Sequence, residues 1–405
     1  MNATRQVDAA RRFEPTEHYA EWRQGCPLHH EADHEPPFYV VSRFSDVLDV
    51  LKHPELWSNR DGPGVQYLDP GVLGSADDPD HGRHRRVLRT SFVPTAIKRL
   101  EPQLRTTADQ LIDTFVDAGE CDFARQFAAP FPALAIAELL GIHGDDRADF
   151  GRWSDQAVAA LTGGDLETYY RAKRALEDYV EAGCDARAAQ LAAGGAIPDD
   201  VLSVLTLARR EGTLANQEVR HLGYQLLVAG HETTTSLLGM LLYRLLEQPA
   251  LMSAIREDFD LIPVAVEEAL RFDSPVHGLF RTNAEECVVH GETIPPRTKL
   301  QVCYAAANRD PEQFAAPDMF RLDRERGELG RHVAFGWGIH FCIGAPLARL
   351  EARVAFEQLL GRLAHIELAG EPTRNDSFVL HGLTRLPIRF AKAGDQYRTR
   401  QSEEA

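Results

Sequence analysis

A single cysteine near the end of the chain stands in a pattern that could bind a metal. Phe335, Gly338, Cys342 and Gly344 form the motif F-x-x-G-x-x-x-C-x-G, and a predicted helix over residues 343–364 follows it. The free N–H groups at a helix N-terminus favour a thiolate. The glycines leave room for a large flat ligand, and the aromatic residues shield the sulfur from water. A buried cysteine in a glycine-rich turn is the alternative interpretation.

A second polar pattern interrupts an apolar predicted helix over residues 216–247. It reads "LLVAGHETTTS" and contains Ala229, Gly230, Glu232 and Thr233. The two small residues leave space beside the helix, and a carboxylate next to a hydroxyl can relay protons. The alternative is a polar pair without catalytic work, with the threonine bonded back to its own helix.

Two further sets of charged residues have informative spacing. Glu268 and Arg271 lie three residues apart on a predicted helix, which makes them an ion pair, usually a solvated one. His81 and Arg85 lie four apart on one helix face, where they could bind a carboxylate. Their neighbours, Arg83 and His84, are expected to face solvent.

The composition excludes several classes of protein. The 405 residues carry a net charge of −17, which argues against nucleic-acid binding. Six cysteines without a C-x-x-C pair argue against zinc and dithiol sites. The N-terminal residues lack a signal-peptide core, and no apolar run is long enough for a membrane anchor. These features predict a reduced, cytoplasmic protein. No strand followed by G-x-G-x-x-G indicates a flavin or nicotinamide site.

Helical periodicity dominates, so the predicted fold class is mainly α with small β-sheets. A stripe from Ile97 to Phe115 predicts one helix, and a helix is also expected over 145–161. Strands are expected at 38–42 and 299–305, with a hairpin around His290. No linker divides the chain, which predicts one domain over residues 1–405 with flexible tails at about 1–12 and 393–405. The Gly/Pro-rich stretch 58–80 is a long loop, either a lid or a surface excursion.

Together these motifs resemble the cytochrome P450 family over nearly the whole chain. The resemblance implies a helical prism that encloses a b-type haem. It also implies that the Cys342 thiolate is the axial ligand of the iron, as thiolates are in this family. It implies that Glu232 and Thr233 deliver protons. It also implies that Glu268 and Arg271 are buried and joined by Arg324, as a structural network.

The resemblance assigns further residues to the cofactor and the substrate. The expected haem-binding set is Cys342, the propionate partners His81, Arg85, Arg281 and His340, and the wall residues Phe335, Gly336, Gly344, Ala229 and Gly230. The expected substrate contacts are Leu227, Ala229, Thr233, His277, Leu279 and Phe280. His231 and His277 are each expected to meet water or a backbone carbonyl more readily than a ligand.

The implied function is that of a haem-thiolate monooxygenase. It activates O2 with electrons from a ferredoxin-type donor, which a separate NAD(P)H reductase supplies, and hydroxylates an apolar small molecule: a terpenoid, steroid, fatty acid or aromatic. Arg331, Arg349 and Arg353 are expected to contribute to docking the acidic donor. Two alternatives stay open: a haem-thiolate peroxygenase or isomerase, and a non-enzymatic haem-binding sensor.

Overall fold

The computed structural model describes residues 16–25, 27–68, 71–142, 166–375, 377 and 379–394. The chain divides into two compact units. Unit 1 comprises residues 1–82, 267–342 and 378–381, and unit 2 comprises residues 83–266, 343–377 and 382–405. Two of the unit boundaries, after residues 82 and 266, fall inside helices α4 (Asp80–Phe92) and α13 (Ile262–Asp273). The prediction of one domain over the whole chain stays a prediction.

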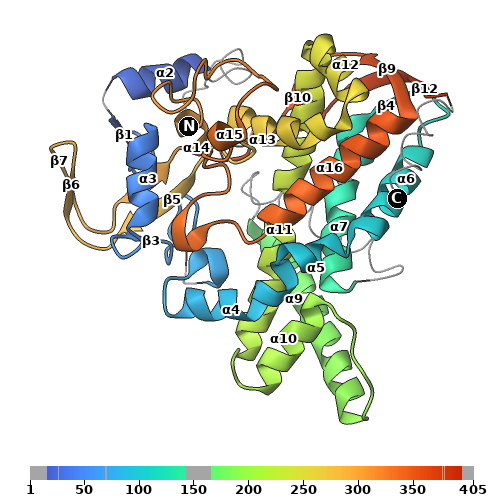
Figure 1. Cartoon of the computed structure of the whole chain (residues 1–405). Helices are drawn as coiled ribbons and strands as arrows, with labels where there is room; N and C mark the ends of the chain where they lie inside the picture. Colours follow the sequence, from blue (N-terminus) through green and yellow to red (C-terminus); the bar gives the residue numbers. More distant parts are fainter. Residues whose placement is uncertain are drawn as a thin grey trace. The chain divides into compact units, whose positions relative to one another are not determined.

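Unit 1 is built on a five-stranded sheet of order β1-β2-β8-β5-β3, drawn in blue and orange in Figure 1. Its strands are β1 (Leu28–Glu31), β2 (Phe38–Val41), β3 (Trp57–Ser58), β5 (Leu279–Asn283) and β8 (Lys299–Val302). The pair β2–β8 is parallel, and the other pairs are antiparallel.

Strand β2 is buried on both faces, which explains its continuous run of apolar residues "FYVV". Because side chains alternate along a strand, Phe38 and Val40 join Phe280 in one hydrophobic cluster. Tyr39 and Val41 join a second cluster, in which strand β8 and helix α3 take part. The sheet is therefore the centre of the unit 1 core.

Short helices and one hairpin complete unit 1. The hairpin pairs β6 (Cys287–Val289) with β7 (Glu292–Ile294), and its turn residues His290 and Gly291 both have positive φ. This is the backbone that a two-residue hairpin needs, so the predicted hairpin is confirmed. The helices are α2 (Thr16–Gln24), α3 (Phe44–Lys52), α14 (Tyr304–Ala307) and α15 (Arg326–Leu329), with 3-10 turns η1 (Leu73–Ser75) and η4 (Gly338–His340).

Unit 2 is mainly helical. Helix α11 (Asn216–Glu247) packs against α7 and α9, and α16 packs against α6 (Figure 1). The other helical segments are α5 (Pro94–Lys98), α6 (Glu101–Asp113), η2 (Ala124–Ala128), α7 (Pro130–Leu140), α9 (Leu166–Ala192), α10 (Val201–Arg210), α12 (Pro249–Glu257), η3 (Phe259–Leu261) and α16 (Ala345–Arg362). The strands are β4 (Glu120–Asp122), β9 (Leu363–Leu368), β10 (Thr373–Arg374), β11 (Leu383–Arg385) and β12 (Pro387–Lys392), in two sheets of order β4-β12-β9 and β10-β11.

The structure corrects two predicted elements. The stripe from Ile97 to Phe115 is not one helix: α5 ends at Lys98, α6 runs from Glu101 to Asp113, and Phe115 lies in the turn that follows. Pro102 lies in the first turn of α6, where its missing N–H costs nothing. The predicted strand 299–305 ends at Val302, and helix α14 follows. The predicted helix over 145–161 and nearly all of the two tails lie outside the described residues. Among the described helices, none has the length and apolar content that a membrane span requires.

Candidate functional site

The loop that carries Cys342 is closed by backbone hydrogen bonds. The Cys342 amide donates to the Phe335 carbonyl at 2.9 Å, and the Gly336 amide donates to the Val333 carbonyl at 2.9 Å. Gly336 and Gly338 have φ of +70° and +68°, and a Cβ on Gly338 would lie 2.8 Å from the Leu51 carbonyl oxygen. These two positions therefore require glycine. The loop presents Cys342 on an exposed position, three residues before α16 begins.

The other described cysteines are poor metal ligands. Burial raises the pKa of Cys121 and of Cys303 to about 12, and it also raises the pKa of Cys184 and Cys287. Because the thiolate is the ligand, these groups stay protonated at neutral pH. No cluster of three or more His, Cys, Asp or Glu side chains suited to a metal occurs in the described part of the chain. One cysteine would be enough to hold a haem iron, because the porphyrin nitrogens supply all of the in-plane ligands. A zinc site needs several protein ligands, so one exposed cysteine does not suit it.

Two of the four basic candidates lie together in unit 1. The His81 and His340 rings have centroids 4.1 Å apart. His81 is buried and lies 3.6 Å from the Asp78 carboxylate. Arg281 is also buried, on β5, and donates to the Phe280 carbonyl at 2.9 Å. Arg85 lies one turn after His81 on α4 and is partly exposed.

The expectation that Arg83 and His84 face solvent is wrong. His84 is 1% exposed, and its Nε2 lies 2.9 Å from the Glu218 carboxylate. Arg83 is half-buried and makes a two-pronged contact with the same carboxylate, with the shorter hydrogen bond at 2.6 Å. These partners lower the pKa of Glu218 to about 2. Glu218 therefore fixes helix α4 to the start of α11, a long-range contact that local spacing cannot indicate.

Replacement of Glu218 by glutamine is expected to lower the free energy of unfolding at pH 7 by about 1–3 kcal/mol, because two charge-assisted contacts are lost. The carboxylate has a lower pKa in the folded chain than in the unfolded chain. Its contribution is therefore complete above the ordinary value of 4.5 and is lost as the pH falls from 4.5 toward 2.

Urea unfolding at two pH values measures this effect. The difference in the free energy of unfolding between the wild-type protein and Glu218→Gln should be about 1 kcal/mol smaller at pH 3.5 than at pH 7. The exposed Glu211, at the end of α10, provides the control Glu211→Gln, which should change neither value. A difference for Glu218→Gln that is the same at both pH values would contradict the assignment.

The predicted proton-delivery residues lie in the middle of α11. The Thr233 hydroxyl donates to the Ala229 carbonyl at 2.9 Å, which is the local bond weighed as an alternative above. Ala229 is exposed and Glu232 is partly exposed, whereas a Cβ added to Gly230 would meet the Ile136 side chain of α7 at 3.4 Å, an ordinary van der Waals distance. The face with Ala229, Glu232 and Thr233 is thus the accessible face of this helix.

The apolar substrate candidates differ in exposure. Leu227 and Phe280 are fully buried, so their side chains supply packing and not a surface for a ligand. Leu227 and Ala229 lie about 200° apart around the helix, and Phe280 and Leu279 alternate on strand β5, so neither pair can share a face. Leu279 and Ala229 keep exposed surface.

Both histidines near the candidate surfaces are packed against protein groups. His231 is buried, and its Nε2 lies 3.0 Å from the Ala129 carbonyl oxygen, the kind of contact expected for it. The His277 ring lies edge-on to His381, with centroids 4.5 Å apart, and to Tyr19 at 6.0 Å.

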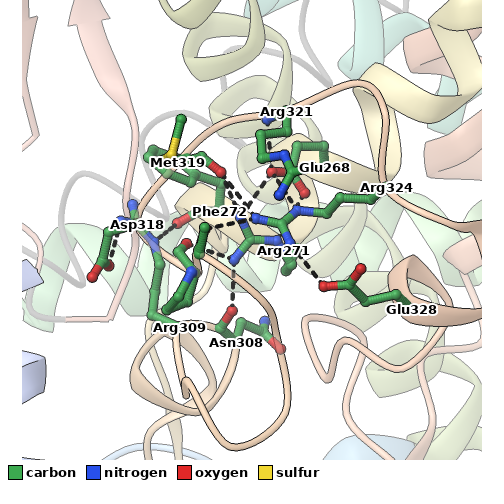
Figure 2. Close-up of polar contacts among 12 residues, drawn as sticks. Glu268, Arg271, Phe272, Asn308, Arg309, Asp318, Met319, Arg321, Arg324 and Glu328 are labelled. Carbon is green, nitrogen blue, oxygen red and sulfur yellow. Dashed lines mark hydrogen bonds and ion pairs between the residues drawn. The ribbon is translucent and has the colours of Figure 1, made fainter.

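Glu268, Arg271 and Arg324 form a buried ion-pair network, shown in Figure 2. Arg271 binds the two Glu268 oxygens at 2.8 Å each, and Arg324 Nε donates to Glu268 Oε1 at 3.0 Å. All three side chains have 0% exposure. Their remaining N–H groups donate to carbonyls of the segment 308–319 and to Glu328. A buried network that is this fully bonded fixes the path of the segment.

Asn308 connects this network to the cysteine loop, a role that the sequence did not suggest. Its carbonyl accepts from Arg271 at 2.9 Å, and its Oδ1 accepts from the Val333 amide at 2.7 Å. His332, next to Val333, lies 3.0 Å from the Glu267 carboxylate. The start of the cysteine loop is therefore held by α13 through two routes.

One of the three arginines expected at the donor-docking surface is neutralised. Arg353 of α16 donates to Glu101 of α6 at 2.7 Å and to Glu357 at 2.9 Å. Arg105 contacts the same two carboxylates. This ion-pair network joins α6 to α16. Because its charge is neutralised there, Arg353 adds little to a positive surface, and the docking hypothesis depends on Arg331 and Arg349.

Comparisons with known proteins agree with this geometry. The cytochrome P450 family profile matches residues 152–389. Cytochrome P450 107B1 of Saccharopolyspora erythraea is 37% identical over 87% of this chain and 89% of its own. Vitamin D(3) 25-hydroxylase of Pseudonocardia autotrophica is 35% identical over 91% of this chain and 92% of its own. The crystal structure of CYP109E1 from Bacillus megaterium with corticosterone is 29% identical, covers 94% of this chain and 99% of that one, and has a TM-score of 0.83.

The fold is thus that of a family of haem-containing oxidoreductases. The chain belongs to the cytochrome P450 family. The predicted fold class and the predicted enzyme class, a cytochrome P450 monooxygenase, are confirmed.

Proposed function

We propose that this chain binds haem b through the Cys342 thiolate and hydroxylates an apolar small molecule of steroid-like size with O2. The exposed Cys342 in its glycine-closed loop carries this proposal. Two relatives favour steroids among the expected classes of apolar substrate. One is named as a vitamin D(3) 25-hydroxylase, and the structure of the other contains corticosterone. Electrons come from a ferredoxin-type donor with a separate NAD(P)H reductase.

The residues around the cofactor have distinct roles in this proposal. Cys342 supplies the thiolate, and His81, His340, Arg281 and Arg85 bind the propionates, since carboxylates need cations or N–H donors where they meet protein. The haem, when bound, supplies the redox chemistry that splits O2. Gly336, Gly344 and Ala229 keep bulky side chains away from the porphyrin faces, and Phe335 keeps water from the sulfur. Gly230, which is turned toward Ile136 of α7, is left out of this set.

Glu232 and Thr233 deliver protons. In the structure the Thr233 hydroxyl proton is donated to the Ala229 carbonyl, which leaves the lone pairs of Oγ1 able to accept a proton from water or from Glu232. Passing a proton onward requires this hydroxyl to rotate away from Ala229. Glu232, which is partly exposed, can take up a replacement proton from solvent.

Replacement of Thr233 by alanine is expected to lower product formation by about 100-fold, the range for loss of a positioned acid or base. Glu232→Gln, which changes no expected substrate contact, should have a similar effect on product formation and leave ligand binding unchanged. Thr235 donates to the His231 carbonyl at 3.1 Å, so Thr235→Ala removes the same kind of helix bond and is the matched control. Equal losses in Thr233→Ala and Thr235→Ala would show that helix bonding, and not proton delivery, is disturbed.

A reconstituted assay tests the proposed function. The purified protein is supplied with a ferredoxin, its reductase, NADPH and a panel of steroids, and the products are analysed by mass spectrometry. Incorporation of one 18O atom from 18O2 is the expected result. Products that form with H2O2 alone and do not depend on the electron donor would instead identify a peroxygenase. Binding of steroids without any altered product would favour the sensor.

A further inference from the structure

Lys299 is a fully buried lysine in the central sheet of unit 1. It begins β8, all four residues of which are buried, and it has 0% exposure. Lysine is almost never fully buried unless its ammonium has partners, because an unpaired buried charge is expensive. The partners of this ammonium therefore carry structural information.

All of these partners belong to residues 59–68, here called the access loop. The Lys299 ammonium donates to the Asp61 carbonyl at 3.0 Å and to the Gly62 carbonyl at 3.3 Å. It also lies over the Tyr67 ring, 5.0 Å from the centroid. Among the described residues no carboxylate makes a hydrogen bond to the ammonium, although the charge of Asp61 acts on it through space. The ammonium is therefore paired only while the access loop covers it.

The access loop is closed on itself. The Leu68 amide donates to the Asp61 carbonyl at 3.0 Å, and the Gly62 amide donates to the Asn59 carbonyl at 2.9 Å. Gly62 has a φ of +85°, so a left-handed residue makes the turn that aims both carbonyls at Lys299. The Tyr67 hydroxyl donates to the Arg297 carbonyl, two residues before Lys299, at 2.5 Å.

The access loop also holds the start of β5. The Phe280 amide donates to the Pro63 carbonyl at 2.8 Å, and Val65 packs against the cluster that contains Phe280. The next residue toward the N-terminus, Leu279, is the partly exposed apolar side chain predicted to meet the substrate. Movement of the loop would therefore break the hydrogen bond that fixes the backbone next to Leu279.

We propose that Lys299 is a positioning residue for ligand access: closure of the access loop and burial of the Lys299 ammonium are one event, and this event sets how fast an apolar ligand enters and leaves. The identity of the ligand rests on the proposed function, whereas the coupling of loop and lysine does not. Burial lowers the pKa of Lys299 to about 8, so opening of the loop returns the ammonium to water and recovers part of its solvation.

Hydrogen exchange measures the coupling without any need for activity. Lys299→Met keeps an unbranched side chain that is one atom shorter. Peptides covering residues 59–68 and 279–283 should exchange at least about 10-fold faster in this variant, since two bonds to a charged donor are lost. Tyr67→Ala changes an exposed residue that tolerates replacement, and it should raise the exchange rate of the same peptides by about 3-fold.

Arg297→Met is the matched control. Arg297 also lies over the Tyr67 ring, but its side chain is 71% exposed and its guanidinium is 3.8 Å from the Asp61 carboxylate. Loss of this side chain should therefore change the exchange rate by less than about 2-fold. Unchanged exchange of the access loop in both Lys299→Met and Tyr67→Ala would overturn the proposal.

Ligand kinetics test the second half of the proposal. The probe is 4-phenylimidazole, an apolar ligand that coordinates haem iron, and its binding is followed by absorbance in a stopped-flow instrument. The dissociation rate should rise about 10-fold in Lys299→Met, in proportion to the loop exchange, and should stay within 2-fold of wild type in Arg297→Met. Faster exchange without faster dissociation would overturn the role in access. A wild-type protein that binds no haem would instead refute the proposed function, and the exchange result would still decide whether Lys299 holds the loop.

Discussion

Replacement of Arg271 by leucine is expected to lower the free energy of unfolding by about 3–5 kcal/mol, the range for removal of one partner from a buried charge network. The change leaves Glu268 in a fully buried position with one of its two arginine partners missing. It also removes the donors to the carbonyls of Asn308, Pro317 and Met319. Since a typical domain has a stability of 5–15 kcal/mol, much of the variant should be unfolded or aggregated.

Arg321→Leu is the control for this prediction. Arg321 lies just after the segment 308–319 and close to Glu268 (Figure 2). Its side chain pairs with the exposed Asp323, and only its backbone amide donates to Glu268. Its replacement should cost less than about 1 kcal/mol, as for a surface ion pair. Urea unfolding of both variants measures the contrast. A loss below 1 kcal/mol for Arg271→Leu would contradict the structural role of the network.

The second large effect is on activity. Cys342→Ala is expected to reduce product formation in the reconstituted assay by at least about 1,000-fold, because the variant lacks the thiolate that the proposed function assigns to the haem iron. The fold should be preserved, since Cys342 is exposed and its amide bond to Phe335 does not need the side chain.

Cys121→Ala separates loss of a ligand from loss of a cysteine. Cys121 is buried in β4, and burial raises the pKa of its thiol to about 12. Its replacement should cost some packing stability but leave product formation within about 3-fold of wild type. Full activity in Cys342→Ala, measured beside this control, would show that the thiolate is supplied elsewhere.

Patterns with a fixed local geometry could be predicted from the sequence. The 32-residue helix α11 was expected with the bounds that it has, because its periodicity is long and its ends are marked. The hairpin at His290 was expected because its turn needs residues that tolerate positive φ. The glycines of the cysteine loop also follow from local geometry, since two of them take a backbone that other residues avoid.

Long-range pairing explains what could not be predicted. His84 is buried because Glu218, 134 residues away, lies against it, and no local pattern indicates that contact. The burial of Lys299 depends on carbonyls about 237 residues earlier in the chain. Ala229 is exposed and Leu227 is buried because the two residues point to opposite sides of the helix. The expectation that both contact the substrate rested on residue type and ignored this angle.

The most direct measurement of the central assignment is the absorption spectrum of the reduced protein with carbon monoxide, in wild type and in Cys342→His. A thiolate opposite carbon monoxide shifts the main haem band strongly to the red, whereas an imidazole does not. The wild-type protein should show the red-shifted band, and Cys342→His should bind haem without it. A wild-type spectrum of the imidazole type, or a red-shifted band that persists in Cys342→His, would contradict Cys342 as the axial ligand.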